Sequence, residues 1–298
     1  MEILATHGLG WQPSLPDFRD YFVEHAVVRE MVASLRPFSP SRRQLPGRVD
    51  LREYFPDVSD QGTINSSTAF ACADMAEYFE RRAHGRISAR SKRFLYKVAR
   101  KLLGTVGDSG ADLRTTLRAM VCFGMPPEHH WPYDVERFDE EPGAFLYLFS
   151  DHYRSIRYAR LDNRNSSGAK TLRTVKAFLA AGFPCALGFP VPTSISQDGN
   201  VPYRPTFDRV CGGQAVIAVG YDDQHLSTTR GALLLRNSWG SSWGENGYGW
   251  LSYPYVEEQL AADIWTLLRA DWLASGEFRR PPLGDLPRTT PKASLLRP

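Results

Sequence analysis

The chain has 298 residues, of which 42% are hydrophobic and 12% are aromatic, enough to fill one large domain or two lobes with apolar side chains. The 36 Lys and Arg residues exceed the 33 Asp and Glu residues by three, and this charge is too small to indicate a nucleic-acid partner. The sequence opens without a secretory signal and holds no apolar run near the roughly 18 residues of a membrane span, so a cytoplasmic protein without membrane contact is expected.

The first elements along the chain are an extension and a series of helices. Residues 1–47 are interrupted by Pro and Arg and are expected to drape over a core. Four helices follow, the first with apolar or small residues at helical spacing, and each closes on a glycine. They lie at 67–85, 91–104, 111–124 and 169–182. Ser66 is the expected N-cap of the first helix.

After residue 182 the pattern changes to short runs that are rich in β-branched or aromatic residues and bounded by Gly, Pro, Asn or Asp, which predicts strands. These runs are 184–190, 212–223, 231–239, 247–255 and 262–270. A helix-rich half followed by a strand-rich half indicates an α+β protein of two lobes with a cleft between them. The helical lobe is expected at 48–165, the β-rich lobe at 166–277 and a disordered tail at 278–298.

The four cysteines do not indicate a shared site. Cys72, Cys122, Cys185 and Cys211 are widely spread, without C-x-x-C spacing. Neither a zinc cluster nor a disulfide framework is indicated, and reduced, partly buried thiols are expected. Nothing in the sequence implies a metal or an organic cofactor.

Three sequence blocks occur in order: "QGTINSSTAFA" from residue 61, "GGQAVIAVGYDD" from residue 212 and "RNSWGSSWGENGYGW" from residue 236. Together they resemble the papain-like cysteine peptidases, and "GWQPSLPDFRDY" ahead of "VDLR" resembles a bacterial branch of that family. The likeness extends from about Trp11 to about Ala270. It implies a papain-like fold in which a helical left lobe faces an antiparallel, β-barrel-like right lobe across the cleft.

The resemblance also assigns roles to residues, and two of these roles are lost. In the family, the first block carries a catalytic cysteine and, six positions earlier, a glutamine that helps form the oxyanion hole. Here Gln61 is retained, but Ser67 stands at the nucleophile position. The histidine base of the second block is replaced by Gln214. The third block retains Asn237, which in the family orients the histidine, and Trp239, which shields the pair.

These replacements predict that Ser67 is inert. A serine hydroxyl is a weak nucleophile unless a base takes its proton, and a glutamine amide does not titrate near neutral pH. In other nucleophile–base enzymes, loss of either member lowers turnover by roughly 10⁶-fold. Natural loss is preferred to an engineered substrate trap, which would need only the cysteine change. His225, His129 and His130 lie away from the nucleophile in sequence and are not expected to replace the base.

Two further departures from the family pattern lie in the helical lobe. Members with a disulfide there have one cysteine three residues before the nucleophile and another in a G-C-x-G-G turn. These positions are Ile64 and Asp108 here, which fits a reducing compartment. The same turn continues through Gly110 to Ala111, whose backbone would pair with a bound peptide. An extended peptide held by strand-like hydrogen bonds is therefore an expected ligand.

A run of basic residues without acidic ones lies between Glu80 and Asp108. Such a run is usually a solvated helical face, and the alternative is a binding face for an acidic partner. The candidate residues are Arg81, Arg82, Arg90 and Arg93. A protein or a nucleotide-bearing cofactor is favoured over nucleic acid, because no nucleic-acid-binding motif accompanies the run.

Three functions remain open from the sequence. The leading one is a pseudopeptidase that binds a peptide or protein segment in its cleft without cleaving it. The second is a repurposed enzyme that uses Gln61, Ser67, Gln214 and Asn237 to position a substrate for acyl transfer or cyclisation, for example in a biosynthetic pathway. The third is a scaffold that acts through the basic face. Whether the N-terminal extension occupies part of the cleft is not determined by the sequence.

Overall fold

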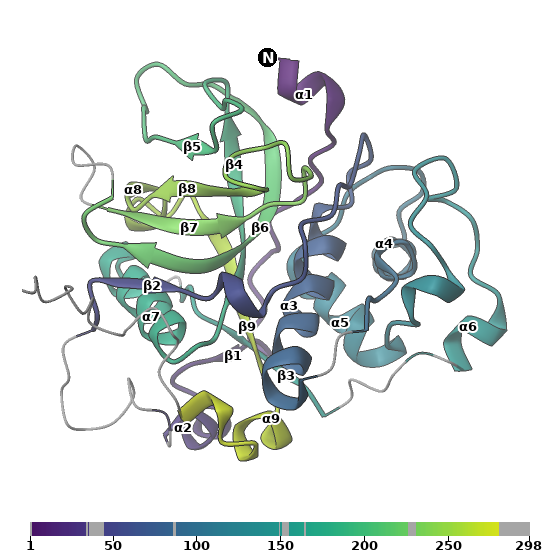
Figure 1. Ribbon diagram of the computed structural model, residues 1–298, viewed down its shortest axis with the longest axis horizontal. Helices are drawn as coiled ribbons and strands as arrows, with labels where there is room; N and C mark the ends of the chain where they lie inside the picture. Colours follow the sequence, from purple (N-terminus) through teal and green to yellow (C-terminus); the bar gives the residue numbers. More distant parts are fainter. Residues whose placement is uncertain are drawn as a thin grey trace, which may run out of the picture.

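Helix α3 (Ser67–His84) lies at the boundary between a helical half and a sheet half of the molecule (Figure 1). The structure is a computed structural model that describes residues 2–33, 35, 45–85, 88–148, 150, 155–163, 165–225 and 231–279. Helices α4 (Lys92–Leu103) and α5 (Leu113–Phe123) pack against α3, and strand β6 (Val210–Asp222) also packs against it. The expected α+β class is confirmed.

The flanking residues of α3 explain where it begins and ends. Gly85 ends the helix in the left-handed region at φ 67°, and its N–H donates to the carbonyl oxygen of Arg81. Ser66 occupies the N-cap position, as predicted, but its side chain makes no capping hydrogen bond. Its hydroxyl lies 2.7 Å from that of Tyr133 instead. Because the residues of the first turn are buried, packing rather than a side-chain cap stabilises this end of the helix.

Three more helices lie close to their predicted ranges. Ser91, Asp112 and Ser167 cap α4, α5 and α7 (Gly168–Ala180), and each accepts a hydrogen bond from the backbone N–H three residues later. A glycine follows both α4 and α5, as predicted. Helix α7 packs against β6 and therefore belongs to the sheet half.

One mixed sheet of nine strands forms the sheet half of the described chain, in the order β1-β3-β9-β4-β6-β7-β8-β5, with β2 paired to β6. The predicted strands are confirmed as β4 (Cys185–Pro192), β6, β7 (Ala232–Arg236), β8 (Tyr248–Ser252) and β9 (Ala262–Leu268), which pair antiparallel. The strands that were not predicted are β1 (Tyr21–Phe22), β2 (Arg48–Asp50), β3 (Arg157–Arg160) and β5 (Asn200–Val201). Since β2 and β3 lie within 48–165, the range expected for the helical lobe also contributes to the sheet.

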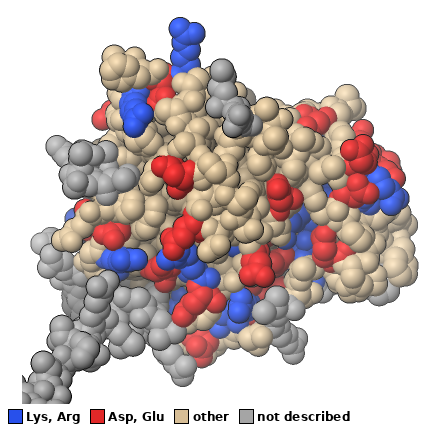
Figure 2. Space-filling model, turned by 45° about the horizontal axis from the view of Figure 1, so that its top comes forward, with Lys and Arg blue, Asp and Glu red and all other residues tan. Residues whose placement is uncertain are grey.

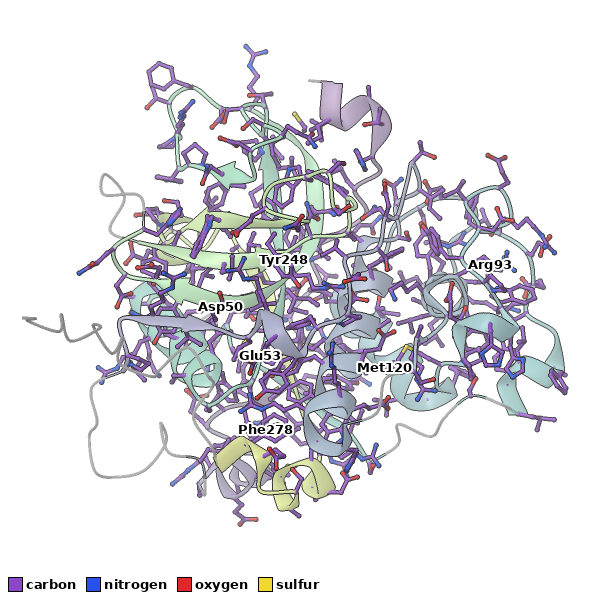
Figure 3. The ribbon with its side chains drawn as sticks, in the orientation of Figure 1. Asp50, Glu53, Arg93, Met120, Tyr248 and Phe278 are labelled. Carbon is purple, nitrogen blue, oxygen red and sulfur yellow. The ribbon has the colours of Figure 1, made fainter. Side chains whose placement is uncertain are left out.

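Short helices complete the described chain. They are α1 (Glu2–Thr6), α2 (Ala26–Val32), η2 (Arg52–Tyr54), η3 (Glu128–His130), α6 (Ala144–Leu148), α8 (Pro254–Glu257), α9 (Ala270–Ala274) and η4 (Glu277–Arg279). Trp272 of α9 stacks on Phe79 of α3 with 4.9 Å between ring centroids. Phe278, which is labelled in Figure 3, packs against the same Phe79 ring. The disordered tail expected at 278–298 is corrected at its start, because Phe278 is buried and belongs with Arg279 to η4, and the rest of the tail lies outside the described residues. Among the residues described, no helix is both long and apolar enough to cross a membrane.

A buried cluster of charges joins the two halves beside α3. Arg236 of β7 donates to Asp74 of α3 at 2.8 Å, and Lys92 of α4 lies 3.0 Å from Asp74 and 3.5 Å from Glu77. All four side chains are buried, so loss of one partner would leave an uncompensated charge. Burial raises the pKa of Glu77 to about 7. Burial also acts on Asp74, but Lys92 and Arg236 outweigh it and hold its pKa below the usual value.

The raised pKa of Glu77 predicts a stability that depends on pH. Folded Glu77 keeps its proton between its ordinary pKa of 4.5 and about 7, where the unfolded chain has lost it. We therefore expect the free energy of unfolding to fall from pH 5 to pH 8, by at most about 3 kcal/mol relative to a Glu77→Gln variant. Thermal melts of both proteins at each pH measure the difference in stability between them. A difference that does not change with pH would contradict the raised pKa of Glu77.

Candidate functional site

The residues at the positions expected to be catalytic meet where α3 contacts β6. Ser67 is the first residue of α3, Gln214 lies on β6, and Asn237 and Trp239 follow β7. Gln61, which lies ahead of α3, contacts this group through its side chain. All five side chains are buried. The structure thus brings together residues that lie in three separate blocks of the sequence.

A network of amides and one hydroxyl occupies the place where a base would act. Gln214 Nε2 donates to Asn237 Oδ1 at 2.9 Å and to Gln61 Oε1 at 3.1 Å. Ser238, which the sequence did not single out, donates its hydroxyl to Gln61 Oε1 at 2.5 Å and its N–H to Asn237 Oδ1 at 2.9 Å. Since the Ser238 N–H fixes Asn237 Oδ1 as an acceptor, the Gln214 amide must present its nitrogen there. Asn237 therefore orients Gln214.

In the part of the chain that the structure describes, no titratable side chain is hydrogen-bonded to the Ser67 hydroxyl. Its Oγ accepts a hydrogen bond from the Ala215 N–H at 3.2 Å, and no hydrogen bond joins it to Gln214. A neutral amide is not a base strong enough to take a hydroxyl proton. The start of α3 would favour an anion at this position, but a serine hydroxyl stays uncharged near neutral pH.

The described histidines at positions 7, 129, 130 and 225 make contacts with other groups and do not replace that base. His7, which the sequence interpretation overlooked, packs on Trp239 with 5.7 Å between ring centroids, and its Nε2 faces Asp60 at 3.7 Å. His225 stacks on Trp250 at 4.0 Å, where burial lowers its pKa. His129 and His130 belong to η3 in the helical half.

An extended stretch of residues 7–14, here called the N-terminal segment, fills the cleft over these positions. Figure 1 shows it descending from α1 between β6 and α3. Its Gly8 N–H donates to Gly62 O of the helical half, and its Trp11 N–H donates to Gly213 O of β6, both at 2.9 Å. The N-terminal extension, which the sequence could not place, therefore lies between the two halves.

Ala111 pairs with this segment as a neighbouring strand would. Its N–H donates to Gly10 O at 2.9 Å, and its carbonyl oxygen accepts from the Gln12 N–H at 3.1 Å. Gly110 lies directly under Gly10, and an added Cβ on Gly110 would run into the Gly10 carbonyl. The backbone pairing expected of Ala111 is present, and its partner is the chain itself.

The Gly8 carbonyl occupies the Gln61 amide, which the resemblance assigned to an oxyanion hole, and also the Trp239 indole N–H. Gln61 Nε2 donates to Gly8 O at 3.0 Å, and Trp239 Nε1 donates to the same oxygen at 3.2 Å. Gln61 Nε2 also lies 3.1 Å from Leu9 O. While the N-terminal segment is bound, these donors are not available to a substrate carbonyl.

Trp11 anchors the N-terminal segment in a pocket of the sheet half. Its ring lies against Gly188 of β4 and Gly213 of β6, where an added Cβ would run into the indole. The indole N–H donates to Asp263 Oδ2 at 3.2 Å. Ser14 donates to the same carboxylate through its N–H at 2.7 Å and through its hydroxyl. One buried carboxylate thus holds two residues of the segment.

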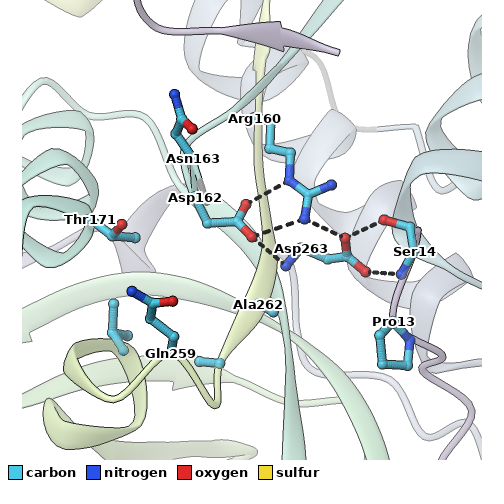
Figure 4. Close-up of a pocket in the computed structure, with 11 residues that line it drawn as sticks. Pro13, Ser14, Arg160, Asp162, Asn163, Thr171, Gln259, Ala262 and Asp263 are labelled. Atoms are coloured by element: carbon cyan, nitrogen blue, oxygen red, sulfur yellow. Dashed lines mark hydrogen bonds and ion pairs between the residues drawn. The ribbon is translucent and has the colours of Figure 1, made fainter. Parts of the chain in front are cut away.

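Ion pairs fix that carboxylate in turn. Arg160 of β3 lies 3.1 Å from Asp263, 3.0 Å from Asp162 and 3.2 Å from Asp20. Figure 4 shows the first two pairs in a pocket of about 430 Å³ beside Ser14. Burial raises the pKa of Asp263, and the hydrogen bonds from Ser14 and the charge of Arg160 oppose that rise. The segment is therefore clamped where it leaves the cleft.

Asp108 connects the helical lobe to the segment by hydrogen bonds. Its carboxylate accepts from the Asn65 N–H at 2.8 Å and from the Tyr96 hydroxyl at 2.6 Å. Asn65 Oδ1 accepts from the Leu9 N–H at 2.9 Å. The turn that was compared with a disulfide-bearing one is thus joined to the start of α3 without a covalent bond, and all four cysteines are free.

The four arginines named as candidates in the basic run do not form the exposed face that was expected. Arg82, Arg90 and Arg93 are buried, whereas Arg81 is partly exposed. Figure 3 places Arg93 inside the helical half, where its guanidinium lies 4.1 Å from the centre of the Trp131 ring. On the face shown in Figure 2, acidic and basic side chains are interspersed. The run is explained by interior pairing, because carboxylates, carbonyls and aromatic rings surround these cations.

Asp263→Asn is expected to loosen the N-terminal segment, because a neutral amide is a weaker acceptor for Trp11 and Ser14 and leaves Arg160 with one carboxylate fewer. Amide hydrogen exchange across residues 8–14 should accelerate by roughly tenfold or more. The matched control is Asp208→Asn, whose carboxylate binds Ser194 instead. Equal protection of the segment in both variants would contradict the clamp.

Comparison with known proteins shows which family the chain matches and over which residues. Residues 45–257 match the model of the papain family cysteine proteases, and the N-terminal segment precedes this range. An uncharacterized peptidase C1-like protein of Acanthamoeba polyphaga mimivirus is 32% identical over 280 residues, which cover 88% of this chain and 87% of that protein.

Solved structures are similar over the same extent. Xylellain, a cysteine protease from Xylella fastidiosa, matches with a TM-score of 0.70 at 31% identity, over 88% of this chain and 96% of its own. The digestive procathepsin L2 proteinase of the Tenebrio molitor larval midgut shares the fold, with a TM-score of 0.67 at 20% identity over 90% of this chain and 79% of its own. With its matching fold and a family match over most of its length, the chain belongs to the papain family of cysteine proteases.

Proposed function

We propose that this chain is a papain-family protein without peptidase activity, and that its cleft binds an extended peptide or protein segment without cleaving it. The observation that carries the proposal is the amide network at Gln214, which stands at the base position and is hydrogen-bonded to Asn237 and Gln61. Ser67 is hydrogen-bonded to the β6 backbone and not to Gln214.

The loss of activity follows from the chemistry of the two replacements. A thiolate and an imidazolium share a proton readily near neutral pH, whereas a hydroxyl and an amide do not. Removal of one member of such a pair costs roughly 10⁶-fold in turnover in other enzymes. Since Ser67 and Gln214 replace both members, peptide hydrolysis is expected at background level.

The binding half of the proposal is supported by the N-terminal segment. Both walls of the cleft still hold an extended backbone, through Ala111 on one side and Gly213 on the other. Any partner must displace the segment, whose tether gives it an effective concentration on the order of millimolar. We therefore infer a partner that binds tightly or that contacts a second surface.

Two further features bear on where the protein acts. The four free cysteines support a reducing compartment such as the cytoplasm. The 31% identity to xylellain supports the placement in a bacterial branch that the "GWQPSLPDFRDY" stretch suggested.

The Ser67→Cys, Gln214→His double variant tests the proposal against the unmodified protein. Because the N-terminal segment fills the cleft, both proteins also receive a site for a sequence-specific protease between Leu15 and Phe18, which are 80% and 93% exposed. The segment can then be severed after folding. We expect the unmodified protein to leave a broad panel of fluorogenic peptides uncut before and after severing. The severed double variant should cleave them roughly 10³-fold faster or more.

Ser67→Cys alone is the matched control, since it restores the thiol without the base and should remain far below the double variant. Hydrolysis by the unmodified protein that is abolished by Ser67→Ala would overturn the loss of activity. A folded, severed double variant that cleaves nothing would show that the cleft no longer accepts peptides, and would contradict the binding half.

A further inference from the structure

The N-terminal segment indicates which peptides the cleft accepts, an inference that rests on the proposed binding function. We propose that the cleft selects a partner peptide with the pattern Gly-x-Gly-Trp, and that "GLGW" at residues 8–11 is the chain's own copy of this pattern. The partner is thus an extended segment of another protein that competes with residues 8–11 for the same place.

Hydrogen bonds to the backbone fix the register of whatever lies there. Gly62 and Gly213 accept from the N–H groups of the first and fourth residues of the pattern, and Ala111 donates to the third carbonyl. These contacts involve main-chain atoms of the bound segment, so they hold any extended peptide and do not distinguish among side chains.

Side chains are excluded at the first and third residues. An added Cβ on Gly8 would lie within 3.0 Å of the Ile64 carbonyl group, and one on Gly10 would lie within 3.0 Å of the backbone of Asn65. Gly10 also has a φ of 114°, which L residues with side chains rarely adopt. Glycine is therefore required at both positions.

The backbone under these glycines is held in place and cannot easily retreat. Gln61 Nε2 donates to Ile64 O at 2.9 Å, and the Asn65 N–H donates to Asp108 at 2.8 Å. Gln61 and Ile64 are buried. A bound side chain would have to break these hydrogen bonds to make room, and unpaired buried polar groups are costly.

The fourth residue meets a flat pocket with a single acceptor at its end. Gly188 and Gly213 leave space for a planar ring, because a Cβ on either would run into the Trp11 indole. Asp263 accepts the indole N–H at 3.2 Å. Phenylalanine would fill the same space but would leave this buried carboxylate without that donor, so tryptophan is preferred.

The second residue is less restricted. Leu9 is only partly buried, and its side chain lies against Gly212 of β6. Leu9 also binds through its backbone, with its N–H donating to Asn65 Oδ1. A change of this side chain to alanine should therefore matter much less than a change at either glycine.

The test uses the severed full chain described above and a labelled synthetic peptide of residues 5–15, ATHGLGWQPSL. After the severed segment is removed by gel filtration, fluorescence anisotropy measures peptide binding. We expect Gly8→Ala and Gly10→Ala peptides to bind at least roughly tenfold more weakly than the parent peptide, and Trp11→Phe severalfold more weakly. The Leu9→Ala peptide is the matched control and should lie within about threefold of the parent peptide.

Two outcomes separate this inference from the proposed function. If the parent peptide binds and both alanine peptides bind equally well, the pattern is wrong while the binding function stands. If the parent peptide itself does not bind the folded, severed chain, both fail.

A second measurement does not depend on severing. Gly10→Ala in the uncut chain should accelerate hydrogen exchange across residues 8–14, whereas Leu9→Ala should not. Unchanged protection in Gly10→Ala would overturn the inference. A dimer of the uncut chain in light scattering that exchanges its segments would assign the pattern to a second copy, and would overturn the assignment to a separate partner.

Discussion

Hydrogen bonds from both walls of the cleft to the backbone of residues 8–12 determine whether the site is occupied. They join the helical half and β6 to one extended strand. This strand places a carbonyl group on Gln61 and Trp239 and an indole beside Asp263. Replacement of such a buried indole by alanine costs a folded protein about 3–5 kcal/mol. The segment therefore contributes to the stability of the fold while it is bound.

The amide at the position expected for a base belongs to a polar network of neutral groups. A buried amide needs hydrogen-bond partners and carries no charge. The Gln214 nitrogen finds its partners in Asn237 and Gln61, and Ser238 donates hydrogen bonds to both of these residues. Retained framework residues thus satisfy a neutral group instead of orienting an ionisable one.

Much of the fold could be predicted from the sequence, because its signals are local. Glycines such as Gly85 and Gly104 mark helix ends within a few residues. The short strands β1 and β5 carry no such signal, since two residues show no period and their partners are distant in the chain. Ser238 was missed because its hydrogen-bond partner Gln61 is distant in the chain. The N-terminal extension could not be placed because its partners are also distant in the chain. The basic run was misinterpreted because burial of Arg93 against Trp131 depends on contacts between separate elements.

The central claim, that Ser67 has no base to activate it, is tested most directly by covalent labelling with a small fluorophosphonate, a reagent that phosphonylates activated serines with loss of fluoride. The protein with Ser67 and Gln214 unchanged and with the added protease site is labelled after its N-terminal segment is severed, so that access to Ser67 does not limit the reaction. Mass spectrometry then identifies the labelled residue. We expect no label on Ser67. A stoichiometric label on Ser67, lost in Ser67→Ala, would contradict the account and indicate that the site retains nucleophilic chemistry.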